Sequence, residues 1–129
     1  MGFSVREMFA AYERLGDAVW RGLMYGNRLE IVEEGADHLE LKTGMGRFAF
    51  DAVRKTIRRK DRLIARFEEI RKVILRTRTV DIDLFIWSVS LEKTDGRIVD
   101  LGKSTDDVEA SIAAAHVARL IGVDVDSVR

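Results

Sequence analysis

Residues 85–102 read FIWSVSLEKTDGRIVDLG, and the expected architecture is built outward from them. From Phe85 to Glu92 large apolar side chains recur at every second position, which is typical of a strand with one buried face. Asp95-Gly96 then separates two extended segments, and glycine accepts the positive φ that a tight hairpin turn requires. The segment therefore predicts two antiparallel strands, with Trp87 and its alternating neighbours on the inner wall of a curved sheet.

The flanking segments predict a third strand and a helix. Residues 67–79 are rich in Ile and Val, so we expect a strand that pairs with the Trp87 strand. Further on, Ser104 is followed three residues later by Asp107, a variant of the capping box that favours a helix start. An alanine-rich face then continues to Gly122, a residue type that commonly ends helices. We expect this helix to be laid against the sheet.

The first 26 residues predict a long amphipathic helix. Ser4 and Glu7 form a capping box, and large apolar side chains recur every three or four residues after it. This stripe consists of Met8, Phe9, Tyr12, Leu15, Val19, Trp20 and Leu23. Burial of each such side chain contributes roughly 1.5–3 kcal/mol to stability, so we expect this stripe to pack against another apolar surface. Either the rest of the domain or a second copy of the chain is expected to supply it.

Residues 27–102 are expected to form an antiparallel sheet. Short alternating runs on either side of Gly35-Ala36 predict a hairpin, and Phe48 and Phe50 open another strand. Residues 51–66 leave two alternatives open, because their apolar residues fit one face of a helix as well as two short strands that turn at Lys60-Asp61. A helix would give two hairpin-plus-helix units, whereas strands would give one continuous sheet.

Composition limits the class of protein. The chain has 129 residues, no cysteine, and 22 Lys and Arg against 22 Asp and Glu. Its length suits one domain, residues 1–129, and the missing thiols exclude a disulfide framework or a thiolate metal site. No apolar run approaches the roughly 20 residues that span a bilayer, and the N-terminus lacks the order of a signal peptide. We therefore expect a cytoplasmic protein without a cofactor.

From about residue 63 to residue 123, roughly half of its length, the chain resembles the later half of the bacterial pleckstrin-homology-like (PH-like) domains. The resemblance is carried by residues 66–73, 87–91, 94–97, 99–102 and 118–123. It implies an α+β fold in which an antiparallel bent sheet or partial barrel, residues 27–102, is closed by a C-terminal capping helix, residues 103–122. The long N-terminal helix, residues 1–26, departs from that pattern. Such domains serve mainly as binding or assembly modules.

Basic residues gather in the segment 54–78. It holds eleven Lys and Arg against three acidic residues, a net charge of +8 that the rest of the chain offsets. Arg58, Arg59, Lys60 and Arg62 are candidate ligands for lipid headgroups or nucleic acid phosphates. No aromatic residue lies between Ala52 and Arg66 to stack on bases. We favour a solvated, partly self-paired surface over anion binding or an electrostatic match to Glu33-Glu34 and Asp106-Asp107 of a second copy.

The remaining candidate sites are histidines and apolar residues. His38 and His116 are the two imidazoles of the chain, and we interpret both as surface residues rather than metal ligands; no catalytic residue is assigned. Apolar residues on expected outer faces favour self-association, with a dimer as the first expectation. The candidates are Phe9, Tyr12, Trp20, Ile74, Ile86, Val108 and Ile112.

These patterns predict a non-enzymatic binding or assembly module that self-associates. One alternative is an anion-binding adaptor that uses the segment 54–78. Another is a small ligand carrier or enzyme with a pocket between sheet and helix. A second protein is a compatible partner for the module, whereas nucleic acid and membrane surfaces are less favoured partners.

Overall fold

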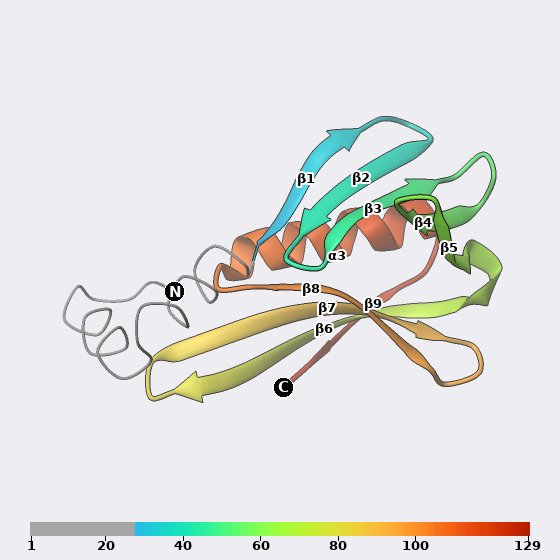
Figure 1. Cartoon of the computed structure of the whole chain (residues 1–129). Helices are drawn as coiled ribbons and strands as arrows, with labels where there is room; N and C mark the ends of the chain where they lie inside the picture. The colour runs from blue at the N-terminus through green and yellow to red at the C-terminus, as the bar shows by residue number, and fades with distance from the viewer. Residues whose placement is uncertain (1–27) are drawn as a thin grey trace.

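The computed structural model describes residues 28–129, which form two β-sheets and one α-helix (Figure 1). The helix predicted for residues 1–26 lies outside the described residues. The expected α+β fold with one bent sheet or partial barrel is wrong, because the described part is mostly strand and has two sheets. The chain leaves the first sheet at the 3₁₀ turn η1 (Phe67–Glu69) and then begins the second.

The first sheet is an antiparallel meander whose strands follow the order of the chain. It consists of β1 (Leu29–Glu34), β2 (His38–Thr43), β3 (Gly46–Asp51), β4 (Thr56–Arg59) and β5 (Arg62–Arg66). Alternate side chains point into the core, and Phe48, Phe50 and Ile57 are at most 1% exposed. β1 and β5 are the edge strands of this sheet.

Residues 51–66 contain strands rather than a helix, so the strand alternative for this segment is confirmed. The Asp51 carboxylate accepts hydrogen bonds from the backbone N–H groups of Val53 (2.9 Å) and Arg54 (3.1 Å), which stabilises a turn directly after β3. Lys55 then adopts a φ of 56°, a conformation that a right-handed helix does not contain. The local hydrogen bonds of the turn therefore stop the helix that the apolar spacing permits.

The second sheet has the strand order β8-β7-β6-β9. Its members are β6 (Ile70–Asp81), β7 (Leu84–Lys93), β8 (Ile98–Ser104) and β9 (Val125–Val128). The predicted hairpin between β7 and β8 is confirmed, with Gly96 at a φ of 88° in its turn. The sequence does not predict β9, which follows the helix and pairs in parallel with β6.

The helix α3 (Asp107–Ile121) lies between the two sheets (Figure 1). Asp106 caps its start by accepting from the N–H groups of Val108 and Glu109, and Gly122 ends it at a φ of 89°. The role of C-terminal capping helix predicted for this segment is wrong, because α3 contacts strands of both sheets and the chain continues into β9. Its buried residues are Ala110, Ala113, Ala114, Val117 and Ala118. Most of these side chains are small, which lets both sheets approach the helix closely.

One hydrophobic core joins α3 to the inner faces of both sheets. Val89 and Leu91 of β7 are fully buried in it. Trp87 is half-buried and packs at the margin of this core, with its ring centroid 6.1 Å from that of Phe85. Trp87 therefore borders the core, whose buried phenylalanines are Phe48 and Phe50 of the first sheet and Phe67 of η1.

Candidate functional site

The basic segment 54–78 is divided between the two sheets. Its second half lies on β6, where Arg71 pairs with Glu92 (3.8 Å) and Lys72 pairs with Asp126 of β9 (2.8 Å). The hydrogen bond to Asp126 raises the pKa of Lys72. The first half, residues 54–66, comprises the end of the β3–β4 turn, β4 and β5, and we name it the basic hairpin. The four candidate anion ligands all lie on this hairpin.

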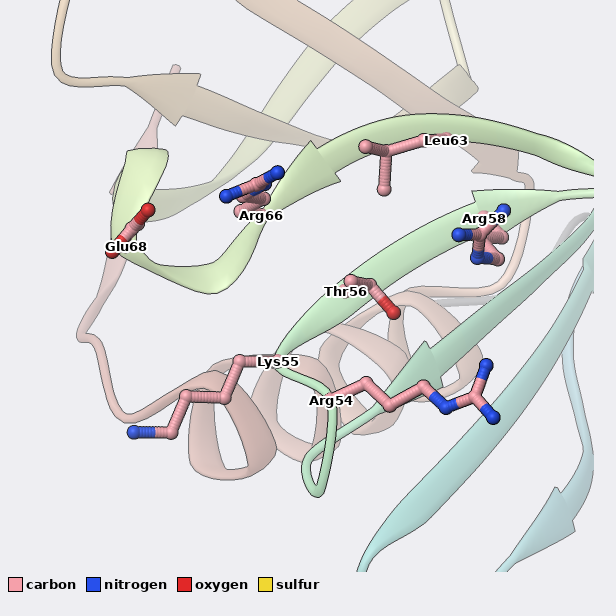
Figure 2. A pocket seen from close by; sticks show the side chains of 7 residues that line it. All are labelled: Arg54, Lys55, Thr56, Arg58, Leu63, Arg66 and Glu68. Carbon is pink, nitrogen blue, oxygen red and sulfur yellow. The ribbon is translucent and has the colours of Figure 1, made fainter.

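The outer face of the basic hairpin is hollowed into a pocket of about 360 Å³ (Figure 2), which we name the basic pocket. It is lined by Arg54, Lys55, Thr56, Arg58, Leu63, Arg66 and Glu68. Cross-strand pairing builds it, because Thr56 lies opposite Arg66 and Arg58 lies opposite Leu63 on the side away from the core. Four cationic side chains therefore surround a hollow that holds one carboxylate.

A second pocket, of about 580 Å³, lies at the other end of β4 and is named the tip pocket. Its lining residues are Met45, Gly46, Arg59, Lys60, Asp61 and Arg62. The Arg59 guanidinium lies 5.9 Å from the ring centroid of Phe48, and this cation–π contact orients it. Three of the four predicted ligands thus meet in the tip pocket, and the fourth, Arg58, lines the basic pocket.

Sequence reasoning did not select Arg54, Lys55 or Arg66, which complete the basic pocket. All three belong to the predicted basic segment. Their convergence could not be derived while residues 51–66 fitted a helix as well as strands. The strand interpretation of residues 51–66 would have indicated part of the pocket, because alternate residues of a strand, such as Thr56 and Arg58, share one face.

Both ends of β4 carry backbone strain. Lys55 and Lys60 each have a φ of 56°, and within residues 28–129 they are the two non-glycine residues with positive φ. This left-handed conformation costs an L-residue roughly 1–2 kcal/mol. Lys55 lines the basic pocket and Lys60 lines the tip pocket. Strain that coincides with surface hollows is a feature of ligand-binding sites.

The positive charge of the basic hairpin is weakly compensated. Residues 54–66 hold seven basic side chains and one acidic side chain. Arg54 lies 4.0 Å from Asp51 with its side chain 76% exposed, and such surface pairs contribute about 0–1 kcal/mol. Arg58 donates a long hydrogen bond of 3.4 Å to the carbonyl oxygen of Asp61. Most of the charge therefore remains available to a ligand.

Glu69 ties the basic hairpin to the second sheet. Its carboxylate accepts a hydrogen bond of 3.0 Å from the backbone N–H of Arg66 and lies 3.3 Å from the ammonium group of Lys93 on β7. The Arg66 hydrogen bond and, after it, the Lys93 hydrogen bond lower the pKa of Glu69. The end of β5, and with it one wall of the basic pocket, is thereby held in place.

The candidate residues for self-association lie on different surfaces. Val108 and Ile112 are on the flank of α3 and are 60% and 47% exposed. Ile74 and Ile86 are each 6% exposed. They lie on the face of the second sheet opposite the core, where their side chains are removed from solvent. Phe9, Tyr12 and Trp20 lie outside the described residues.

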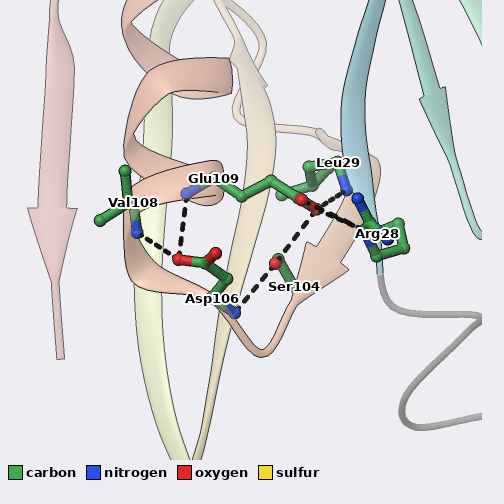
Figure 3. Close-up of polar contacts among 6 residues, drawn as sticks. All are labelled: Arg28, Leu29, Ser104, Asp106, Val108 and Glu109. Atoms are coloured by element: carbon green, nitrogen blue, oxygen red, sulfur yellow. Dashed lines mark hydrogen bonds and ion pairs between the residues drawn. The ribbon is translucent and has the colours of Figure 1, made fainter. Parts of the chain in front are cut away.

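A polar cluster at the start of α3 joins the helix to both sheets (Figure 3). The Glu109 carboxylate accepts hydrogen bonds from the backbone N–H of Leu29 (2.5 Å), from Nε of Arg28 (3.1 Å) and from the Ser104 hydroxyl (3.3 Å). Because its carboxylate is already bound by three donors from the chain, we assign this cluster to stability rather than to ligand binding.

Both histidines pair with glutamates of β1. Nε2 of His38 lies 3.1 Å from Glu33, and Nδ1 of His116 contacts the carboxylate of Glu34. Residues 28–129 contain no group of three or more His, Cys, Asp or Glu side chains that could hold a metal ion. In the same part of the chain, no helix has the length and apolarity needed to cross a membrane.

Comparison with known proteins returns no family model, no curated protein and no solved structure that matches this chain. The resemblance to PH-like domains therefore stays a prediction. The functional evidence comes from the basic hairpin and its two pockets.

Proposed function

We propose that the protein is a non-enzymatic binding module that holds an anionic, phosphate-type ligand in the basic pocket. The proposal is carried by the four cations that line one hollow, Arg54, Lys55, Arg58 and Arg66, together with the carboxylate of Glu68. Guanidinium groups donate paired hydrogen bonds to phosphate oxygens, and lysine adds a mobile point charge. These groups favour the anion-binding alternative over assembly without a ligand.

A ligand carrier or enzyme with a pocket between sheet and helix has less support. Side chains fill that region, since Leu41, Ile57 and Val117 are fully buried between the sheets and α3. The two pockets described within residues 28–129 are lined by the basic hairpin and its neighbouring turns. A ligand of the basic pocket therefore binds at the protein surface.

Binding by such a surface depends on salt. Each phosphate that a Lys or Arg neutralises releases a condensed counterion, so the logarithm of the binding constant falls linearly with the logarithm of the salt concentration. The four cations of the basic pocket predict a slope of about −3 for a linear polyanion. A module that recognises its ligand through apolar contacts would show a much flatter dependence.

The test compares two double variants that lose the same charge. Arg58→Gln/Arg66→Gln removes two cations from the basic pocket, whereas Arg76→Gln/Arg78→Gln removes two exposed cations from β6. We expect the first variant to leave a heparin column at lower salt than the wild type, with the slope against salt reduced by roughly 1.5–2. The second variant should elute near the wild type. Equal elution of the two variants would contradict a role for the basic pocket.

A variant with the opposite effect strengthens this test. Glu68→Gln removes the carboxylate from the basic pocket, so retention on heparin should increase. The exposed position of Glu68 keeps the effect on folding small. Weaker retention of Glu68→Gln would show that heparin binds elsewhere on the surface.

Self-association is a second candidate function, because Val108 and Ile112 leave apolar surface exposed on α3. We expect light scattering of the wild type to give the molar mass of a dimer, which Val108→Ser/Ile112→Ser converts to a monomer. A monomeric wild type would remove this candidate and leave the anion site unaffected.

A further inference from the structure

Exposed aliphatic side chains lie among the cations of the basic hairpin and its turns. Val53 is 74% exposed in the β3–β4 turn and directly precedes Arg54 and Lys55. Leu63 is 41% exposed and lines the basic pocket. Met45 is 48% exposed and lines the tip pocket. Each of the three aliphatic side chains therefore lies beside basic groups, Val53 in the sequence and Leu63 and Met45 in a pocket lining.

This combination of charge and apolar surface matches the boundary of an anionic membrane. Lipid phosphates attract Lys and Arg, and the interface between headgroups and acyl chains accepts aliphatic side chains. Nucleic acid also supplies phosphates, but proteins that bind single strands stack the bases on aromatic rings. Residues 51–66 contain no aromatic residue. The hairpin thus has side chains suited to a lipid surface and lacks those suited to bases.

The basic hairpin distributes its cations over an extended area. The four residues of β4 span about 10 Å, and both pockets are lined by residues along this strand. Figure 2 shows Arg54 and Lys55 extending from the β3–β4 turn in opposite directions. A small phosphate compound fills one pocket, whereas a lipid surface offers phosphates to several of these cations at once. The spread of the charge therefore favours a surface over a small solute.

We propose that the basic hairpin docks on an anionic membrane surface, with Arg54, Lys55 and Arg58 on lipid phosphates and with Val53 and Leu63 in the headgroup region. This assignment rests on the proposed function of the basic pocket and names the source of the anion. Each Lys or Arg near such a surface changes partitioning about fivefold, and each methylene that leaves water changes it about fourfold. Removal of either contribution is therefore measurable.

The test uses the full chain and vesicles of equimolar phosphatidylcholine and phosphatidylglycerol, with phosphatidylcholine vesicles for comparison. We expect co-sedimentation with the anionic vesicles alone. Val53→Ser/Leu63→Ser should lower partitioning to them by at least about fourfold, the effect of one methylene group. Val53 lies outside the basic pocket, so Val53→Ser alone should leave heparin elution unchanged. The matched control Val80→Ser/Ile82→Ser removes side chains that are 42% and 84% exposed near the β6–β7 turn, and it should change neither property.

Three results would separate the membrane assignment from the anion-binding function. Binding to heparin and single-stranded DNA without binding to anionic vesicles would overturn the membrane assignment and leave anion binding in place. Vesicle binding that Val53→Ser/Leu63→Ser does not weaken would overturn the docking geometry. A wild-type chain that binds none of the three probes would overturn both proposals. Circular dichroism and thermal unfolding of each variant verify that the fold is retained.

Discussion

The Thr43 hydroxyl donates a hydrogen bond of 2.6 Å to the backbone carbonyl oxygen of Leu101, across the buried junction of the two sheets. The same oxygen of Thr43 accepts from the N–H of Met45 at 3.0 Å. Thr43→Val keeps the volume but removes both hydrogen bonds, and should lower the free energy of unfolding by about 1–3 kcal/mol in urea. Thr79→Val, at an exposed position of β6, should change it by less than about 0.5 kcal/mol.

Gly102 is closely packed against the same junction. A Cβ atom added there would lie 2.7 Å from Cβ of Thr43 and 3.0 Å from Cδ2 of Leu29. Both neighbours are buried and cannot turn aside, so Gly102→Ala should lower the free energy of unfolding by about 1–3 kcal/mol. Gly35→Ala is the control, because its nearest neighbour is the half-exposed ring of His38, which can move. Equal losses of stability in the two variants would argue against close packing at Gly102.

The strained lysines link stability to binding. Lys55→Gly/Lys60→Gly removes the steric cost of the left-handed backbone together with two cations. The free energy of unfolding should rise by about 1 kcal/mol, because the relief of strain exceeds the entropic cost of glycine, while retention on heparin falls. Lys42→Gly, in the extended backbone of β2, should instead lower the free energy of unfolding by about 0.5–1 kcal/mol. If Lys55→Gly/Lys60→Gly and Lys42→Gly both lowered the free energy of unfolding, backbone strain at Lys55 and Lys60 would be disproved.

Acid should weaken the contact between Glu69 and the basic hairpin. The pKa of Glu69 is lowered from 4.5, first by the N–H of Arg66 and then by Lys93. A carboxyl group with a lowered folded-state pKa contributes stability that is present above its unfolded pKa and is lost as the pH falls through the folded value. The difference in the free energy of unfolding between wild type and Glu69→Gln should therefore shrink below about pH 4.5. Urea titrations at several pH values measure this difference, and a constant difference would refute the assignment.

Strands and helices that end at a characteristic turn or capping residue can be predicted from the sequence. Asp95-Gly96 marks the β7–β8 hairpin and Gly122 marks the end of α3, and both lie at the expected places. β9 has no such marker, because Val125–Val128 is short and pairs with a strand far earlier in the chain. The division into two sheets could not be predicted from the sequence either. The strands of both sheets show the same two-residue alternation of apolar side chains, which does not indicate the sheet to which a strand belongs.

The basic pocket is only partly predictable for a related reason. The charge count selects the segment 54–78, which contains every cation of the pocket. Which cations converge depends on the register of β4 and β5, and that register includes an irregularity between Ile57 and Arg58. The sequence also does not predict the left-handed backbone conformation of Lys55 and Lys60, because lysine rarely adopts a positive φ.

The position of α3 between the sheets has a consequence for biosynthesis. The first sheet and strands β6 to β8 precede α3 in the chain, so a ribosome completes them before the helix exists. Until then Phe48, Phe50 and Leu91 lack the helix that encloses them. We expect the described part of the chain to fold late, as one cooperative unit, and a nascent chain that stops before Asp107 to aggregate.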